Sequence, residues 1–188
     1  MLPLRGGMFT EIKRRAIYPD AKHIDALEVG LEFQDFVCVA LAKEGIILQN
    51  LSSRRYQQNT GENLQGFEIK LDNRWSDTGR LSIETAEKTS ASRESFVRSG
   101  IYRQDNTWLY IQGNYKGIFI FAKNTLQGLH RRTDKPYETK EMPTIQTFYL
   151  PVADCIKYAA KSIWFCQITK QKFIPIRDLA ETRIMQKN

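Results

Sequence analysis

Apolar side chains alternate with Glu68, Lys70 and Asp72 along the segment 66–72, and this alternation constrains the fold more than any other stretch. In an extended strand, residues i and i+2 point to the same face. The segment is therefore predicted to be a half-buried β-strand that is anchored by its apolar side. Its other side presents the carboxylate of Glu68 beside the ammonium of Lys70.

Two kinds of hydrophobic period mark the rest of the chain. A near-helical period between Pro19 and Gly45 predicts one long helix with an apolar stripe. Period-two or apolar runs predict strands, and polar stretches rich in Gly or Pro predict loops, including 133–143. The further elements expected are strands at 80–87, 107–112, 117–122 and 147–150, helices at 124–130 and 152–162, and late strands at 163–166 and 173–176.

This order of elements is typical of an α/β or α+β protein with a central mixed β-sheet flanked by helices. The 188 residues suit a single domain, with a core over about 20–132 and a C-terminal extension over 133–188. No apolar run is long enough for a transmembrane helix, and the N-terminal segment lacks the apolar region of a secretory signal. We therefore expect a cytoplasmic protein without membrane contact.

Glu68 and Lys70 form the pair with the clearest chemistry. A carboxylate can ligate Mg²⁺, a hard cation that prefers oxygen. The neighbouring ammonium can orient an attacking water and contact a phosphate. The bland alternative is a salt-bridged pair on an exposed face of a sheet, and the triplet alone does not decide between the two.

One carboxylate rarely holds a catalytic Mg²⁺, so further acidic residues are needed. The best local candidate for a second ligand is Glu62, six residues upstream of Glu68. The long helix offers Glu32 and, one turn earlier, Glu28, which lie on the same helical face. Glu84, on the following strand, is a further supporting candidate.

The run Gly61-Glu62-Asn63-Leu64-Gln65-Gly66-Phe67-Glu68-Ile69-Lys70-Leu71-Asp72, together with Gly30-Leu31-Glu32-Phe33, resembles the PD-(D/E)xK nuclease superfamily. The resemblance implies a restriction-endonuclease-like fold and Mg²⁺-dependent cleavage of DNA phosphodiesters, with Mn²⁺ as a substitute. By position, Glu68 and Lys70 match the (D/E)xK element. Glu62 would stand for the upstream acid, and Glu32 for the acid on the first helix. Homodimerisation would suit cleavage of a duplex.

The formal net charge of +7 favours an anionic partner, nucleic acid first. Candidate phosphate contacts are the pairs Arg54-Arg55 and Arg131-Arg132 and the spread of lysines. Arg74 and Trp75 follow the Glu68 strand in a polar turn and are further candidate contacts with nucleic acid, Trp75 by stacking on a base. Trp108, within an apolar strand, is expected in the core.

Three function classes remain open. The first is a metal-dependent DNA endonuclease of the restriction or phage type. The second is a non-catalytic nucleic-acid-binding protein that keeps a degenerate nuclease fold, and the third is an interaction protein with incidental basic charge. A weaker likeness to GIY-YIG nucleases at Gly100-Ile101-Tyr102 and Tyr110-Ile111-Gln112-Gly113 is more simply explained as sheet core. His130 at a helix end is expected to be favoured as a cation by the helix dipole.

Overall fold

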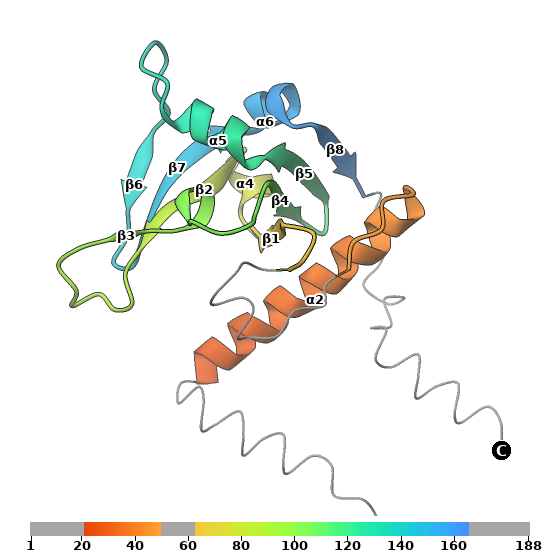
Figure 1. Ribbon diagram of the computed structural model, residues 1–188, viewed down its shortest axis with the longest axis horizontal. Coiled ribbons are helices and arrows are strands. Elements are labelled where there is room, and N and C mark those ends of the chain that lie inside the picture. Colours follow the sequence, from red (N-terminus) through yellow and green to blue (C-terminus); the bar gives the residue numbers. More distant parts are fainter. Residues whose placement is uncertain (1–20, 50–62, 166–188) are drawn as a thin grey trace, which may run out of the picture.

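The computed structural model describes residues 21–49 and 63–165, with side chains from residue 28 onward in the first range. Over these ranges the protein is mixed α/β, with four α-helices and two four-stranded sheets (Figure 1). The expected strand at 173–176 lies outside the described residues. The sequence predicted one central sheet, whereas the chain builds two.

The long helix α2 spans Ala21–Lys43 and confirms the prediction of a helix in this region. It is followed by Gly45 in the left-handed region (φ 77°), a conformation that glycine adopts without strain. One side of α2 is buried, with no exposure at Phe33, Val37 and Leu41. These residues recur at intervals of four, so they form one stripe.

The first sheet has the strand order β1-β4-β5-β8. Its strands are β1 (Phe67–Leu71), β4 (Leu109–Asn114), β5 (Gly117–Ala122) and β8 (Lys161–Trp164). The edge strand β1 pairs with β4 in parallel, while the β4–β5 and β5–β8 pairs are antiparallel. The sheet is therefore mixed, and the predicted strand at 66–72 is confirmed as its edge.

The second sheet is antiparallel and has the order β3-β2-β7-β6. Its strands are β2 (Arg80–Glu87), β3 (Val97–Arg98), β6 (Thr139–Glu141) and β7 (Ile145–Pro151). The prediction of a loop over 133–143 is wrong in part, because β6 forms there by pairing with β7. That pairing supplies backbone partners to a segment whose side chains are all polar.

The remaining helices are short. They are α4 (Trp75–Thr78), the 3-10 turn η1 (Gly100–Tyr102), α5 (Lys123–His130) and α6 (Val152–Tyr158). The predicted helix over 152–162 is wrong in its second half, because α6 ends at Tyr158 and β8 begins at Lys161. At the start of α5 the N-cap is Ala122, and no side chain caps it.

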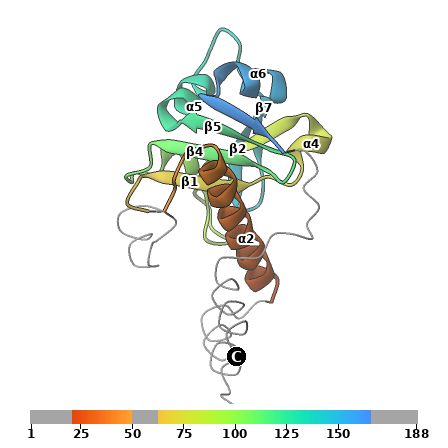
Figure 2. The same ribbon diagram turned by 90° about the vertical axis from the view of Figure 1, so that its right-hand side faces the viewer.

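Apolar residues cover both faces of the first sheet. On one face, α2 packs against a core that includes Phe67, Ile69, Ile111, Ile118 and Ile120. On the other face, the rings of Tyr110, Phe119 and Phe121 pack with residues of the second sheet, α5 and α6. Figure 2 shows α2 extending away on one side, with α5 and α6 on the other. The face of β1 that carries Glu68 is therefore turned toward the protein interior.

The predictions for Trp75 and Trp108 are both wrong. Trp75 was predicted as a surface contact, but it is 4% exposed and packs edge-on against Phe119. Trp108 was predicted in the core, yet it is 61% exposed. Its indole Nε1 donates to the carbonyl of Gln65, 2.8 Å away. Within 21–49 and 63–165, no helix combines the length and apolarity needed to cross a bilayer.

Gly66 is predicted to be indispensable for the start of β1. It has φ 70°, and a Cβ there would lie 2.5 Å from the carbonyl oxygen of Asn106 and 2.7 Å from the ring of Trp108. Gly66→Ala should lower the free energy of unfolding by about 1–3 kcal/mol, measured by denaturant titration. Gly30→Ala is the control, because a Cβ there meets nothing within 4 Å. It should be neutral or stabilise the helix by about 0.5–1 kcal/mol; equal losses in both variants would contradict the steric argument.

Candidate functional site

A tight turn over 63–66 delivers the chain into β1. The Gly66 amide donates to the Asn63 carbonyl at 3.2 Å. The Asn63 side chain then brackets Phe67, donating to its carbonyl at 2.6 Å and accepting from its amide at 3.3 Å. Asn106 donates to the Asn63 carbonyl at 2.8 Å and so ties this turn to the segment before β4. These bonds fix the register of β1 and with it the direction of Glu68.

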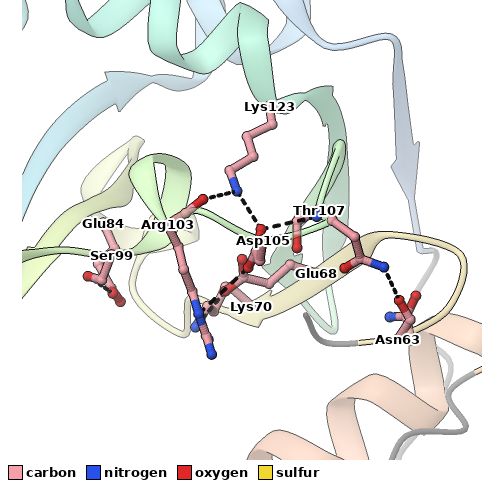
Figure 3. A network of polar contacts seen from close by, with 10 residues as sticks. Asn63, Glu68, Lys70, Glu84, Ser99, Arg103, Asp105, Thr107 and Lys123 are labelled. Atoms are coloured by element: carbon pink, nitrogen blue, oxygen red, sulfur yellow. Dashed lines mark hydrogen bonds and ion pairs between the residues drawn. The ribbon is translucent and has the colours of Figure 1, made fainter. Parts of the chain in front are cut away.

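Glu68 and Lys70 lie side by side, as predicted from the alternation. Lys70 Nζ is 2.8 Å from Glu68 Oε1 (Figure 3). The side chain of Glu68 is only 4% exposed, whereas that of Lys70 is 40% exposed. The pair therefore runs from the interior to the surface, and the expectation of an exposed pair on a solvated sheet face is not met.

The second carboxylate oxygen of Glu68, Oε2, is buried without a hydrogen-bond partner. An unsatisfied buried acceptor costs about 1–3 kcal/mol, and more when it carries charge. Lys70 offsets only part of the charge of the carboxylate. This oxygen is thus suited to accept a further donor or to ligate a cation.

Lys70 lines a pocket of about 310 Å³ between the two sheets. The first sheet contributes Lys70, Tyr110 and Gln112, and the second contributes Ser82, Glu84 and Thr147. Arg74 also lines the pocket, so two basic side chains border it. Gln112 Oε1 and Thr147 Oγ1 are buried without partners. The pocket therefore offers unused polar atoms on both walls.

Glu84 reaches this pocket from the second sheet. It is not adjacent to β1 within a sheet, because β2 belongs to the other sheet. The hydroxyl of Ser99 donates to Glu84 Oε1. Gly100, with φ 50°, lies so close that a Cβ would be 2.4 Å from the Glu84 carbonyl oxygen. Glu84 is thus firmly positioned, and it shares a pocket with Lys70 although 14 positions of sequence separate them.

Asp72 has a structural role that the sequence reasoning missed. Its Oδ1 accepts from the amides of Arg74 (3.0 Å) and Trp75 (3.1 Å), which starts α4. Its Oδ2 accepts from the Ser82 amide at 2.9 Å and from Gln112 Nε2 at 3.5 Å. The sequence signal was an aspartate placed directly before a turn. Its side chain can accept hydrogen bonds from the backbone amides two and three residues further on, as in an Asx-turn.

A second buried carboxylate, also missed, belongs to Asp105 in the segment before β4. Its Oδ1 lies 2.8 Å from Lys123 Nζ and accepts from the Thr107 amide at 3.0 Å. Its Oδ2 lies 3.6 Å from Arg103 Nε. Lys123 is itself 5% exposed, so Asp105 and Lys123 form a buried ion pair that joins the segment to α5. Figure 3 shows this network together with the Glu68–Lys70 pair.

The structure does not bring the helix acids to Glu68. Glu32 lies on α2, which covers the opposite face of the first sheet. Phe33 and Phe36 of α2 contact the ring of Tyr115 in the β4–β5 turn, and burial, followed by the negative charge of Glu32, raises the pKa of Tyr115. Glu28 lies one turn earlier on the same helix. Glu62, Arg54 and Arg55 lie outside the described residues.

The structure gives no support to a cysteine nucleophile or to a GIY-YIG site among the described residues. Burial raises the pKa of Cys38 to about 11 and that of Cys155 to about 12, so neither thiol is an activated nucleophile. Ile101 and Tyr110, from the two segments that are weakly similar to GIY-YIG nucleases, are both buried in the same core. Over the described ranges, no three His, Cys, Asp or Glu side chains converge as a metal-binding group.

Comparison of the chain with protein-family models, curated proteins and solved structures gives no match. The functional argument therefore depends on the geometry of the site.

Asp72→Ala is expected to loosen the junction of the two sheets. The substitution leaves the amides of Arg74, Trp75 and Ser82 without their acceptor, and the free energy of unfolding should fall by roughly 3 kcal/mol. Asp77→Ala is the matched control, because the contacts of the Asp77 carboxylate with the Lys116 ammonium (3.6 Å) and the Ser76 hydroxyl (3.2 Å) are exposed. It should cost no more than about 0.5 kcal/mol in chemical denaturation. Similar costs in the two variants would refute the structural role of Asp72.

Proposed function

We propose that this protein is a metal-dependent DNA endonuclease with a restriction-endonuclease-like core, in which Glu68 and Lys70 form the centre of the site. The observation that carries the proposal is the buried Glu68 carboxylate. One of its oxygens is paired with Lys70 and the other has no partner. Burying a charge in this way destabilises the folded state. A role of Glu68 in binding or catalysis is therefore favoured over a salt bridge that serves stability alone.

The arrangement of the first sheet supports the fold that the proposal requires. It is mixed, it carries the Glu68 strand, and it has α2 on one face and α5 and α6 on the other. The second antiparallel sheet is an addition to this arrangement. It forms the far wall of the pocket and brings Glu84 to the same pocket as Lys70.

The residues fit a divalent cation by their donor chemistry. Carboxylate oxygens are the ligands that Mg²⁺ prefers, and Glu68 Oε2 is a buried acceptor without a partner. Glu68 would hold the ion, with Glu62 as the second ligand and Glu84 in support. When bound, Mg²⁺ or Mn²⁺ supplies Lewis-acid polarisation of the phosphate and lowers the pKa of a coordinated water.

The protein side chains supply binding and orientation. Lys70 extends from Glu68 to the pocket, and its ammonium would donate to a non-bridging oxygen of the scissile phosphate or orient the water. Its pairing with Glu68 fixes its position and limits its freedom, which is what near-attack geometry needs. Arg74 would hold an adjacent phosphate. Hydrolysis adds water across one P–O bond, and the site leaves one strand end with a phosphate and the other with a hydroxyl.

Incubation of the full-length protein with plasmid DNA and Mg²⁺ or Mn²⁺ tests the activity. Wild-type protein should nick or linearise the plasmid, and Glu68→Gln or Lys70→Ala should lower the rate at least about 100-fold. Glu44→Gln and Lys161→Ala are matched controls, because these residues form a comparable ion pair at 3.1 Å that is exposed. Both controls should cleave at the wild-type rate.

Gel-shift measurements at low salt separate the remaining function classes. If wild type and both site variants are inert but bind DNA equally, the protein is a non-catalytic nucleic-acid-binding protein. If none binds even at low salt, where phosphate contacts are strongest, DNA is not the partner. Cleavage that persists undiminished in Glu68→Gln would eliminate Glu68 as the centre of the site.

A further inference from the structure

A second pocket, of about 380 Å³, lies on the other face of the second sheet. We call it the arginine pocket, because Arg98 of β3 and Arg131 after α5 both line it, together with Tyr102, His130 and Gln146. Adjacent residues of a strand point to opposite faces. Gln146 lines the arginine pocket whereas Thr147 lines the Lys70 pocket, so the strand β7 separates the two.

The two arginines converge on one aromatic ring. The guanidinium carbon of Arg98 is 5.7 Å from the centroid of the Tyr102 ring, and that of Arg131 is 5.3 Å away. Both side chains are exposed at their ends. Two like charges beside one ring repel each other, and an anion bound in the pocket that both arginines line would offset this repulsion.

Neither arginine forms an ion pair with a carboxylate among the described residues. The next residue along the chain provides a contrast, because Arg132 is bound through two nitrogens to Asp134, at 3.1 and 2.7 Å. The described residues that line the arginine pocket include no acidic side chain. Gln146, which lines the pocket, donates its side-chain amide to the carboxylate of Glu141 at 2.9 Å.

The floor of the pocket is rigid. The Tyr102 hydroxyl lies 2.8 Å from His130 Nδ1, and the His130 ring packs at a tilt of 39° against the buried ring of Phe148, with 5.0 Å between the ring centroids. Burial, followed by the positive charge of Arg131, lowers the pKa of His130, contrary to the cation expected from the helix dipole. The neutral ring can accept the hydrogen bond of the tyrosine. The ring that the two arginines flank is thus fixed in place.

We propose that the arginine pocket binds a phosphate group, carried either by a free nucleotide or by a nucleic-acid strand. A guanidinium presents a planar fork of donors that matches phosphate oxygens, and two forks suit the several oxygens of one phosphate. The pocket is larger than a phosphate alone, which leaves room for the sugar attached to it. This inference is independent of cleavage at Glu68, because the two pockets open on opposite faces of the sheet.

Isothermal titration calorimetry of the full-length protein at low salt tests the proposal. Thymidine 5′-monophosphate should bind the wild type, whereas thymidine should not. The double variant Arg98→Ala/Arg131→Ala should weaken this binding at least about tenfold. The variant Arg98→Lys/Arg131→Lys keeps both charges but loses the planar forks, so it should show an intermediate loss.

A charge-matched control removes two cations elsewhere. Lys116→Ala/Lys161→Ala also lowers the net charge from +7 by two, to +5, and the contacts of these two ammonium groups with Asp77, Ser76 and Glu44 are exposed. Its affinity for thymidine 5′-monophosphate should stay within about twofold of wild type, since screened surface charges contribute little. Equal weakening in this control and in the arginine-to-alanine variant would overturn the proposal, as would absent binding to wild type, or a lysine double variant that binds as tightly as wild type.

Two further comparisons identify the source of the phosphate and the place of binding. An oligothymidylate that binds more tightly than the monophosphate, and loses affinity in Arg98→Ala/Arg131→Ala, indicates a strand. Competition by inorganic phosphate with no gain from the oligonucleotide indicates a free nucleotide. Glu68→Gln should bind thymidine 5′-monophosphate as wild type does, whatever the outcome of the nuclease assay. Binding lost in Glu68→Gln but kept in the arginine double variant would assign the ligand to the other pocket and refute the proposal.

Discussion

The carboxylate of Asp72 is the contact on which the rest of the site depends. It ends β1, starts α4 and accepts from the backbone of β2, so one side chain joins three elements. Gln112 reinforces the junction by donating to the Ser82 carbonyl at 2.8 Å. Because these bonds span both sheets, they set the width of the pocket that Lys70 enters. A displacement of Asp72 would move both walls, which is why its effect on stability and its effect on the site are linked.

Coverage of the first sheet on both faces explains the burial of Glu68. A sheet with one solvated face would leave the polar side of β1 in water, and the Glu68–Lys70 pair would contribute little. Here the second sheet faces that side, and the local dielectric falls. As water is excluded, the attraction between Glu68 and Lys70 becomes stronger. The free-energy cost of leaving Glu68 Oε2 without a hydrogen-bond donor or a cation also rises. The environment, more than the residue pair itself, favours a functional interpretation.

Local patterns predicted the elements whose own residues carry a clear hydrophobic period or apolar run. The alternation at 66–72 gave β1 and the pairing of Glu68 with Lys70, and the apolar run at 117–122 gave β5. The strands β2 and β7 were expected, but their assembly into a separate sheet was not, and β6 was missed because it is polar throughout and exists only through its pairing with β7. Trp75 and Trp108 were misplaced for the same reason. Whether an aromatic side chain is buried depends on which distant segment covers it, and no periodicity records that.

A β-bulge in β2 lies between the residues that line the Lys70 pocket and those that line the arginine pocket. Glu84 pairs with Thr147 and Ala86 with Gln146, so Thr85 is the extra residue of a β-bulge. A bulge re-aims the side chains that follow it. Thr85 and Ala86 consequently both line the arginine pocket, while Glu84 remains in the Lys70 pocket. The bulged residue is held on both sides, since its carbonyl accepts from the Ser99 amide and its hydroxyl donates to the Gln146 carbonyl. The Ser99 hydroxyl also donates to the carboxylate of Glu84. Ser99 therefore holds both the bulged residue beside the arginine pocket and the Glu84 side chain in the Lys70 pocket.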